Sequence, residues 1–253
     1  MGKLKLKTLY IAGLVIAGIC APLMPWYCVV LVTLFFLSVL FLACITLSLN
    51  FFIPSKCKAI TSKKLVALTF DDGPARYTEN ILDTLQKHNV QASFFCIGKN
   101  IPGNPLIMNR LKNEGHVIGN HSYSHGYWFD MSGAGKMLAD MRQMDREVEK
   151  AVGLRPLLFR PPYGVMNPSL AQAIKKGGYT SIGWNIRSFD TRIKDKQKLT
   201  SRIIGQLKPG SIILLHDSME ITAAILPELI KEIESNGYTI TRLDKMLNIS
   251  AYA

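Results

Sequence analysis

The sequence predicts an α/β fold in which a parallel sheet or barrel of about seven strands follows an N-terminal transmembrane helical hairpin. Two observations lead to this prediction. Two long apolar runs open the chain, and no Asp or Glu occurs before Asp71. From Leu65 onward, short apolar runs alternate with amphipathic segments about seven times, which is typical of a parallel α/β protein. The 253 residues suffice for one medium-sized domain and an appendage.

The apolar runs span residues 9–24 and 29–52. A helix that crosses a membrane needs about 20 apolar residues, so the second run predicts a span, whereas the first run is slightly short. Trp26, between the runs, suits a turn at the level of the lipid headgroups. Either both runs cross the membrane as a hairpin that turns at residues 22–26, or the first run is a signal-like or re-entrant segment.

The charges of residues 1–70 are all lysines, and they flank the apolar runs: Lys3, Lys5, Lys7, Lys56, Lys58, Lys63 and Lys64. Basic residues favour the cytoplasmic side of a membrane. A hairpin places both groups of lysines on that side, whereas a single crossing places the second group outside. We therefore predict an integral membrane protein that contacts lipid through residues 1–56. We expect residues 57–253 to form a separate folded domain, for which the cytoplasmic face is favoured.

The predicted strands are short apolar runs over residues 65–70, 92–96, 117–118, 157–159, 180–184, 211–215 and 239–242. The predicted helices are the amphipathic segments between them: residues 78–88, a helix from 105, and residues 132–152, 168–177 and 220–235. Residues that favour helix ends support these limits. Thr78 and Asn104 are predicted N-caps, Pro105 is a predicted first helical residue, and Gly153 is a predicted stop.

Polar clusters follow five of the predicted strands. They read DD after Phe70, NHSYSH after Gly119, RPPYG after Phe159, RSFD soon after Trp184 and HD after Leu215. The carboxyl ends of the strands of a parallel barrel meet at one face, where active sites lie. Because the clusters are rich in Asp, His and Arg, they predict a site for metal and acid–base chemistry at this face.

The second cluster contains two histidines four residues apart, His121 and His125, so one helical turn or tight loop can bring both imidazoles to one ion. One carboxylate of the doublet Asp71-Asp72 supplies a third ligand, and three protein ligands with open positions are typical of a catalytic metal site. Simpler interpretations also exist. The doublet can cap the loop that follows it, and Arg160 can belong to a surface ion pair.

The motifs TFDDGP, HSYSH, RPPYG and LLHD, in this order and spacing, resemble those of the polysaccharide deacetylases, the NodB-homology domain of the carbohydrate esterases. The resemblance covers residues 64–247. It implies a distorted (β/α) barrel that hydrolyses N-acetyl groups of amino sugars with a divalent metal, most often Zn²⁺, with Co²⁺ or a similar ion as an alternative.

The resemblance also implies roles for single residues. The implied metal ligands are Asp72, His121 and His125. Asp71 is the general base that activates the metal-bound water, and Arg160 holds and orients Asp71. We expect the strand to end at Phe70, so that both aspartates lie in the turn beyond it. Asp72 then points at the ion, while Asp71 points at the water and at Arg160.

On the other side of the implied site, His216 is the general acid that protonates the leaving amine. The backbone N–H of Tyr163 helps to polarise the acetyl oxygen, and Leu214 lines the pocket for the acetyl methyl group.

The segment WNIRSFDTR supplies two further candidates. Asp190 is the candidate partner of His216, and Trp184 is a candidate substrate contact. The family more often has an additional acid in this segment and a tryptophan after the second one, where this chain has Arg187 and Thr191 nearby.

The expected function is the removal of an N-acetyl group, or another N-acyl group such as formyl, from an amino sugar. A cytoplasmic domain favours a sugar on a polyprenyl phosphate, and an external domain favours peptidoglycan or an exported polysaccharide. Two alternatives come from other classes. One is a catalytically inactive, membrane-anchored glycan-binding protein, and the other is a non-haem iron oxygenase, which uses the same ligand types. The sequence lacks the interleaved aromatic and basic residues that would predict nucleic-acid binding.

Overall fold

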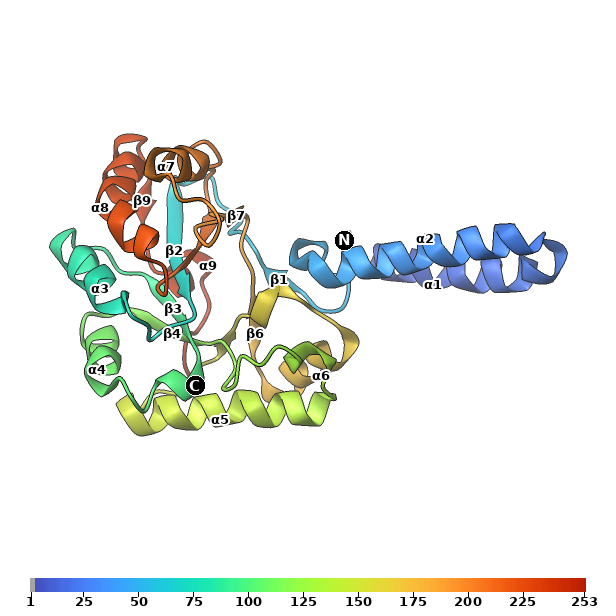
Figure 1. Ribbon diagram of the computed structural model, residues 1–253, viewed down its shortest axis with the longest axis horizontal. Helices are drawn as coiled ribbons and strands as arrows, with labels where there is room; N and C mark the ends of the chain where they lie inside the picture. The colour runs from blue at the N-terminus through green and yellow to red at the C-terminus, as the bar shows by residue number, and fades with distance from the viewer. Residues whose placement is uncertain (1–2) are drawn as a thin grey trace.

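The computed structural model describes residues 3–253, and within them nine strands form one parallel sheet (Figure 1). The strand order is β1-β6-β5-β4-β3-β2-β8-β7, with β9 paired to β2. The bounds are β1 Ser55–Lys56, β2 Leu65–Asp71, β3 Ser93–Cys96, β4 Val117–Asn120, β5 Leu158–Phe159, β6 Thr180–Ile182, β7 Ile186–Arg187, β8 Ser211–His216 and β9 Thr239–Ile240. The parallel α/β fold is thus confirmed. Two strands, β1 and β7, were not expected, because neither lies in an apolar run: their sequences are SK and IR.

The sheet curls into a distorted barrel. Lys58 forms a bridge with Ser211 at the start of β8, and the Ala59 N–H donates to the Gly210 carbonyl at 2.9 Å. On the other side, the Gly183 N–H donates to the Lys56 carbonyl at 3.0 Å. The chain around β1 therefore joins β6 to the first residues of β8. The barrel begins at Ser55, two residues before the predicted start of the domain.

The helices are α1 Lys3–Cys20, α2 Trp26–Ile45, α3 Thr78–Lys87, α4 Pro105–Asn113, α5 Ala134–Val152, α6 Pro168–Gly177, α7 Lys196–Ile204, α8 Glu220–Ser235 and α9 Leu243–Leu247. Short 3₁₀ segments are η1 Ala21–Leu23, η2 Leu47–Leu49, η3 Gly98–Asn100, η4 Phe129–Met131 and η5 Pro162–Gly164. The predicted start at Pro105 and stop at Gly153 are confirmed. One capping prediction is wrong, because Thr78 is the first helical residue of α3 and not its cap. Asn104 does occupy the N-cap position of α4, but its side chain donates to the Asn100 carbonyl instead of accepting a hydrogen bond from the helix.

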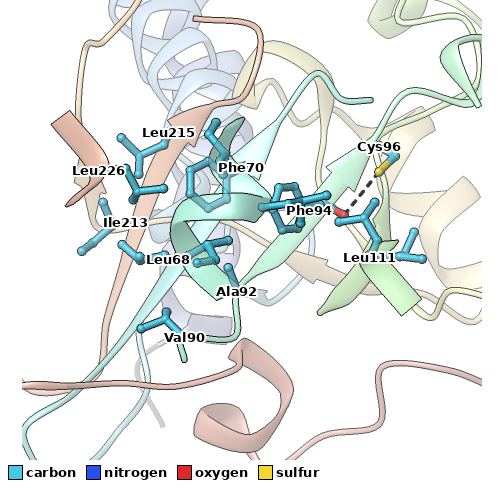
Figure 2. Packing of buried hydrophobic residues seen from close by; sticks show 14 of the residues in the cluster. Leu68, Phe70, Val90, Ala92, Phe94, Cys96, Leu111, Ile213, Leu215 and Leu226 are labelled. Atoms are coloured by element: carbon cyan, nitrogen blue, oxygen red, sulfur yellow. Dashed lines mark hydrogen bonds between the residues drawn. The ribbon is translucent and has the colours of Figure 1, made fainter. Parts of the chain in front are cut away.

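The main hydrophobic core lies between the sheet and the outer helices α3, α4, α5, α7 and α8. Figure 2 shows Leu68 and Phe70 of β2 beside Ile213 and Leu215 of β8. Because side chains alternate along a strand, the residues between them face the barrel interior. The register pairs Asp71 with His216 across β2 and β8. The apolar side chains of β2 and β8 pack against the outer helices, so the alternate side chains, Asp71 and His216, both face the barrel interior.

The two N-terminal helices pack side by side as a hairpin that projects from the domain (Figure 1). The Tyr10 hydroxyl donates to the Phe36 carbonyl at 3.1 Å, and the two rings pack edge to face. Each helix is long and apolar enough to cross a membrane, over Leu6–Leu23 and Trp26–Ile45, and almost none of either stretch is buried in the protein. The chain after α2 joins the domain, since Leu47 is buried in a cluster with Phe159.

Candidate active site

The aspartate doublet is split between a strand and the turn that follows it. Strand β2 continues through Asp71, whose register partners are Phe95 in β3 and His216 in β8. The expectation that the strand ends at Phe70 is therefore wrong by one residue, because both neighbouring strands extend the pairing. Asp72 then takes a left-handed backbone conformation with φ of 77°, which Asp tolerates better than most residues. This change of direction, and not a shared turn, sends the two carboxylates to different partners.

Asp72, His121 and His125 form a cluster whose possible ligand atoms all lie within 4.8 Å of one another. The Asp72 Oδ1 atom is 3.7 Å from Nε2 of His121 and 3.6 Å from Nε2 of His125. In a tetrahedral zinc site with bonds of about 2.0–2.2 Å, two ligand atoms lie roughly 3.3–3.6 Å apart. The three side chains therefore already have nearly the spacing that a small divalent cation requires.

The protonation state of His121 also fits a ligand. Its Nδ1 lies 2.8 Å from the Arg160 carbonyl, to which it donates, so Nε2 is left as the free acceptor that faces Asp72. Burial, together with the adjacent His125, lowers the pKa of His121 to about 3, so the ring is neutral. On the other side of the cluster, the His125 ring lies 4.7 Å from the ring of Tyr163.

Arg160 is fully buried and fixes the orientation of the Asp71 carboxylate. Its Nη1 donates to Asp71 Oδ1 at 2.7 Å and to the Thr69 hydroxyl at 2.8 Å, and its Nη2 donates to the Gly183 carbonyl at 3.1 Å. The guanidinium also stacks 4.1 Å from the ring centre of Phe95. Burial raises the pKa of Asp71, while the charge of Arg160 opposes that shift. The second oxygen, Oδ2, lies 3.8 Å from His121 Nε2 and faces the cluster.

His216, at the end of β8, contacts Asp190 through both its ring and its backbone. Nδ1 lies 2.8 Å from Asp190 Oδ1, and the His216 N–H donates to Asp190 Oδ2 at 2.7 Å. Thr222 of α8 donates to the same Oδ2 at 2.6 Å. Burial disfavours the charged imidazole, but the hydrogen bond and charge of Asp190 outweigh it and raise the pKa of His216 to about 9. Near neutral pH this ring therefore carries a proton on Nε2 that it can donate.

The other predicted residues lie around this arrangement. Tyr163, in η5, has φ of 57° and a half-exposed side chain. Leu214 lies two residues before His216 on the same strand face, and its side chain is almost fully buried. Trp184 packs behind the arginine: its ring centre lies 5.7 Å from the Arg160 guanidinium, and a Cβ on Gly164 would come within 2.6 Å of it. This position supports the RPPYG loop.

Three residues that support the site were not predicted: Thr69, Thr222 and Asp217. Thr69 was detectable, because it lies two residues before Asp71 and must share its strand face. Thr222 carries no local signal. Asp217 is the last residue of the LLHD motif, to which the sequence assigns no role of its own. It is fully buried, accepts a hydrogen bond from Thr78 at 2.6 Å and lies against Gly73, and burial raises its pKa to about 7.

Comparisons with known proteins agree with this geometry. Residues 58–182 match the profile of the family described as polysaccharide deacetylase. The peptidoglycan-N-acetylglucosamine deacetylase PgdA of Listeria monocytogenes is 33% identical over 195 residues, which are 77% of this chain and 41% of that protein. The chain thus spans about two fifths of that relative. The peptidoglycan-N-acetylmuramic acid deacetylase PdaA of Bacillus subtilis is 33% identical over 192 residues, 74% of this chain and 73% of PdaA.

Solved structures show the same fold. The Bc1960 peptidoglycan N-acetylglucosamine deacetylase superimposes with a TM-score of 0.74 at 30% identity and covers 78% of this chain and 94% of its own. The chitin deacetylase of Colletotrichum lindemuthianum gives a TM-score of 0.73 at 27% identity, with the same coverage. Sequence, fold and the arrangement of the four motifs lead to one conclusion: this chain belongs to the polysaccharide deacetylase family.

Proposed function

We propose that the protein is a membrane-anchored, metal-dependent hydrolase that removes the N-acetyl group from an amino sugar of a cell-envelope glycan. The observation that carries this proposal is that one site contains a possible metal-binding cluster, a carboxylate beside it and a protonated histidine. The cluster Asp72, His121 and His125 has the buried base Asp71 on one side, and the protonated His216 is the register partner of that base. Amide hydrolysis needs a water nucleophile, stabilisation of the oxyanion and a proton for the leaving amine.

The cluster would hold the cation through the Asp72 carboxylate and the two Nε2 atoms. When bound there, a divalent cation such as Zn²⁺ supplies a Lewis acid that lowers the pKa of water and polarises the acetyl carbonyl. Asp71 accepts the proton of the attacking water through Oδ2, since Arg160 occupies Oδ1. Arg160 fixes the carboxylate by hydrogen bonds that a lysine could not reproduce.

His216 donates the proton that the amine needs when the C–N bond breaks. Asp190 holds Nδ1, so the ring presents Nε2 to the substrate in a fixed orientation. The backbone N–H of Tyr163 is our candidate for stabilising the oxyanion, and Leu214 is our candidate for contact with the acetyl methyl group. Both lie beside the functional groups named above, on η5 and β8.

The substrate class follows from the relatives whose printed names are peptidoglycan deacetylases. We infer an N-acetylated amino sugar of a cell-envelope glycan. An amino sugar on a lipid carrier has the same N-acetyl chemistry and fits a domain next to a bilayer. The hairpin of α1 and α2 is our proposed membrane anchor, and the remainder of the chain is our proposed catalytic domain.

The test is acetate release from a soluble N-acetylglucosamine oligosaccharide by the full-length protein in detergent. We expect release to stop after treatment with a chelator and to return with Zn²⁺ or Co²⁺. His121→Ala should lower kcat/KM by more than the roughly 10–100-fold that loss of a residue behind a metal ligand costs. His88→Ala, which changes a histidine at the end of α3, is the matched control.

The mechanism is wrong if His121→Ala releases acetate at the parent rate. A well-folded parent that binds the oligosaccharide but releases no acetate with any divalent metal would instead favour a glycan-binding protein.

A further inference from the structure

The loop that follows the second histidine ligand exposes large apolar side chains next to the end of α2. In residues 126–131, Tyr127 is 74% exposed, Trp128 is 68% exposed and Met131 is 75% exposed. We call this segment the aromatic loop. The rings of Tyr127 and Trp128 pack edge to face with centres 4.8 Å apart, so these two exposed side chains form one surface. Soluble proteins rarely leave such a group of large side chains in water without a partner.

The aromatic loop is held rigidly to the segment that leaves α2. Phe129, between the exposed residues, is buried in the same hydrophobic cluster as Leu47, which lies two residues beyond α2. Met166, in that cluster, donates its N–H to the carbonyl of Cys44 in the last turn of α2, at 2.8 Å. The next residue, Asn167, donates from its side chain to the carbonyl of Asp130 in the loop.

These contacts place the aromatic loop at the level where α2 ends. If α2 crosses a bilayer, its last turn lies at the lipid headgroups, because the helix has the length of the hydrocarbon core. Figure 1 shows the hairpin projecting from the side of the domain that carries β1 and α6, with α3 and α4 on the far side. Tyrosine and tryptophan are the residues that favour the membrane–water interface.

We propose that the aromatic loop is a membrane-docking surface whose occupant is the lipid bilayer that α1 and α2 cross. This inference rests on the anchoring part of the proposed function and not on its chemistry. The loop begins directly after the ligand His125, and the Tyr163 hydroxyl contacts the His125 carbonyl at 3.4 Å. Docking of the loop therefore keeps the mouth of the site at the bilayer surface, within reach of a sugar carried on lipid.

The test uses the fluorescence of Trp128 in the full-length protein, reconstituted in phosphatidylcholine–phosphatidylglycerol vesicles. A Trp26→Phe background removes the tryptophan of the hairpin. Comparing this protein with the same protein carrying Trp128→Phe isolates the emission of Trp128. We expect lipids brominated near the headgroup to quench the emission of Trp128. We also expect this emission to lie at a shorter wavelength than the emission of a tryptophan exposed to water, and aqueous acrylamide to quench it only weakly.

A matched reporter comes from the far side of the domain. Leu106, in α4, is 78% exposed, and Leu106→Trp in the protein that lacks Trp26 and Trp128 should be quenched by acrylamide and not by the brominated lipid. If Trp128 behaves like this reporter, the inference is wrong. It is also wrong if a soluble N-acetylated oligosaccharide, and not lipid, protects Trp128, since the loop would then be a sugar-stacking surface.

Acetate release from a soluble oligosaccharide, measured on the same samples, separates this inference from the proposed chemistry. Loss of lipid quenching with normal acetate release overturns the docking surface alone. If the protein fails to float with the vesicles, the proposals of a membrane anchor and of a docking surface are both wrong. The deacetylase proposal is unaffected, because acetate release tests it separately.

Discussion

The backbone conformation at each residue of this site decides which groups its side chain contacts. Asp71 and Asp72 are adjacent, yet one is the last residue of a strand and the other has a left-handed backbone. Asp71 consequently meets Arg160, and Asp72 meets the two histidines. The two carboxylates thus have different main partners, which is consistent with the separate roles that we propose for them, whereas the strand ends one residue later than expected.

The most informative pH dependence belongs to His216. Its pKa is raised from 6.5 to about 9, so the ring keeps its proton up to about pH 9 and loses it above that. An acid catalyst with this pKa gives a kcat/KM that falls on the alkaline side. Asp190→Asn removes the negative charge that raises the pKa, so the alkaline fall should move toward pH 6.5 or below. At pH 8 the loss would be about 30-fold, from the change in protonated fraction.

The measurement is kcat/KM for acetate release from pH 5.5 to 10. Asp195→Asn is the matched control, because Asp195 caps α7 at the surface and asparagine caps equally well. An unchanged alkaline limb in Asp190→Asn would contradict the pairing of Asp190 with the acid.

At the scale of elements, the turn after β2 is packed more tightly than its polar sequence indicates. A Cβ on Gly73 would come within 2.1 Å of Asp217 Oδ2, and Asp217 is fully buried against Thr78. Asp217 also donates its N–H to the Asp71 carbonyl at 3.2 Å. The glycine therefore lets the ends of β2 and β8 approach each other, and with them Asp71 and His216, the proposed base and acid.

We expect Gly73→Ala to displace the turn that carries Asp72 and to lower kcat/KM by about 100-fold, since an error near 1 Å in a catalytic group has that effect. Gly103→Ala is the control, because a Cβ there meets nothing within 4 Å. Zinc affinity, measured by competition with a chelator, should fall in Gly73→Ala and not in Gly103→Ala. Equal activity of the two variants would show that Asp217 moves aside freely.

The elements also show where prediction from sequence stops. Strands β2 and β8 were found because each contains four consecutive apolar residues, LVAL and IILL, which leave a clear signal. The two-residue strands β1 and β7 were not found, since each is defined by its partner and not by its own pattern. Thr78 was expected to cap a helix. Its hydroxyl instead donates a hydrogen bond to Asp217, a buried carboxyl group that needs a donor.

At the scale of the whole molecule, the proposed membrane anchor makes the available substrates depend on the side of the membrane on which the domain lies. The lysines on both sides of the hairpin favour the cytoplasmic face. We therefore expect protease added to intact cells or spheroplasts to leave the domain whole, and to cleave it after lysis. The measurement is an immunoblot with an antibody to the C-terminal residues, together with a known external protein as the control. Cleavage in intact spheroplasts would place the domain outside and favour peptidoglycan.

The sequence by itself determined the parallel α/β class, the family and the choice of residues for the site, because strand periodicity and motif spacing are local properties of the chain. Only the tertiary structure decided which of those residues meet. It brings Asp190 to His216 across 26 positions and Arg160 to Asp71 across 89. It also adds Thr222, which no motif marks, and pairs Asp217, the last residue of the LLHD motif, with Thr78. It also binds the aromatic loop to the end of α2. The physical reason is that these contacts depend on the register of neighbouring strands and on the burial of polar groups that need partners, and both are settled only when the whole sheet has closed.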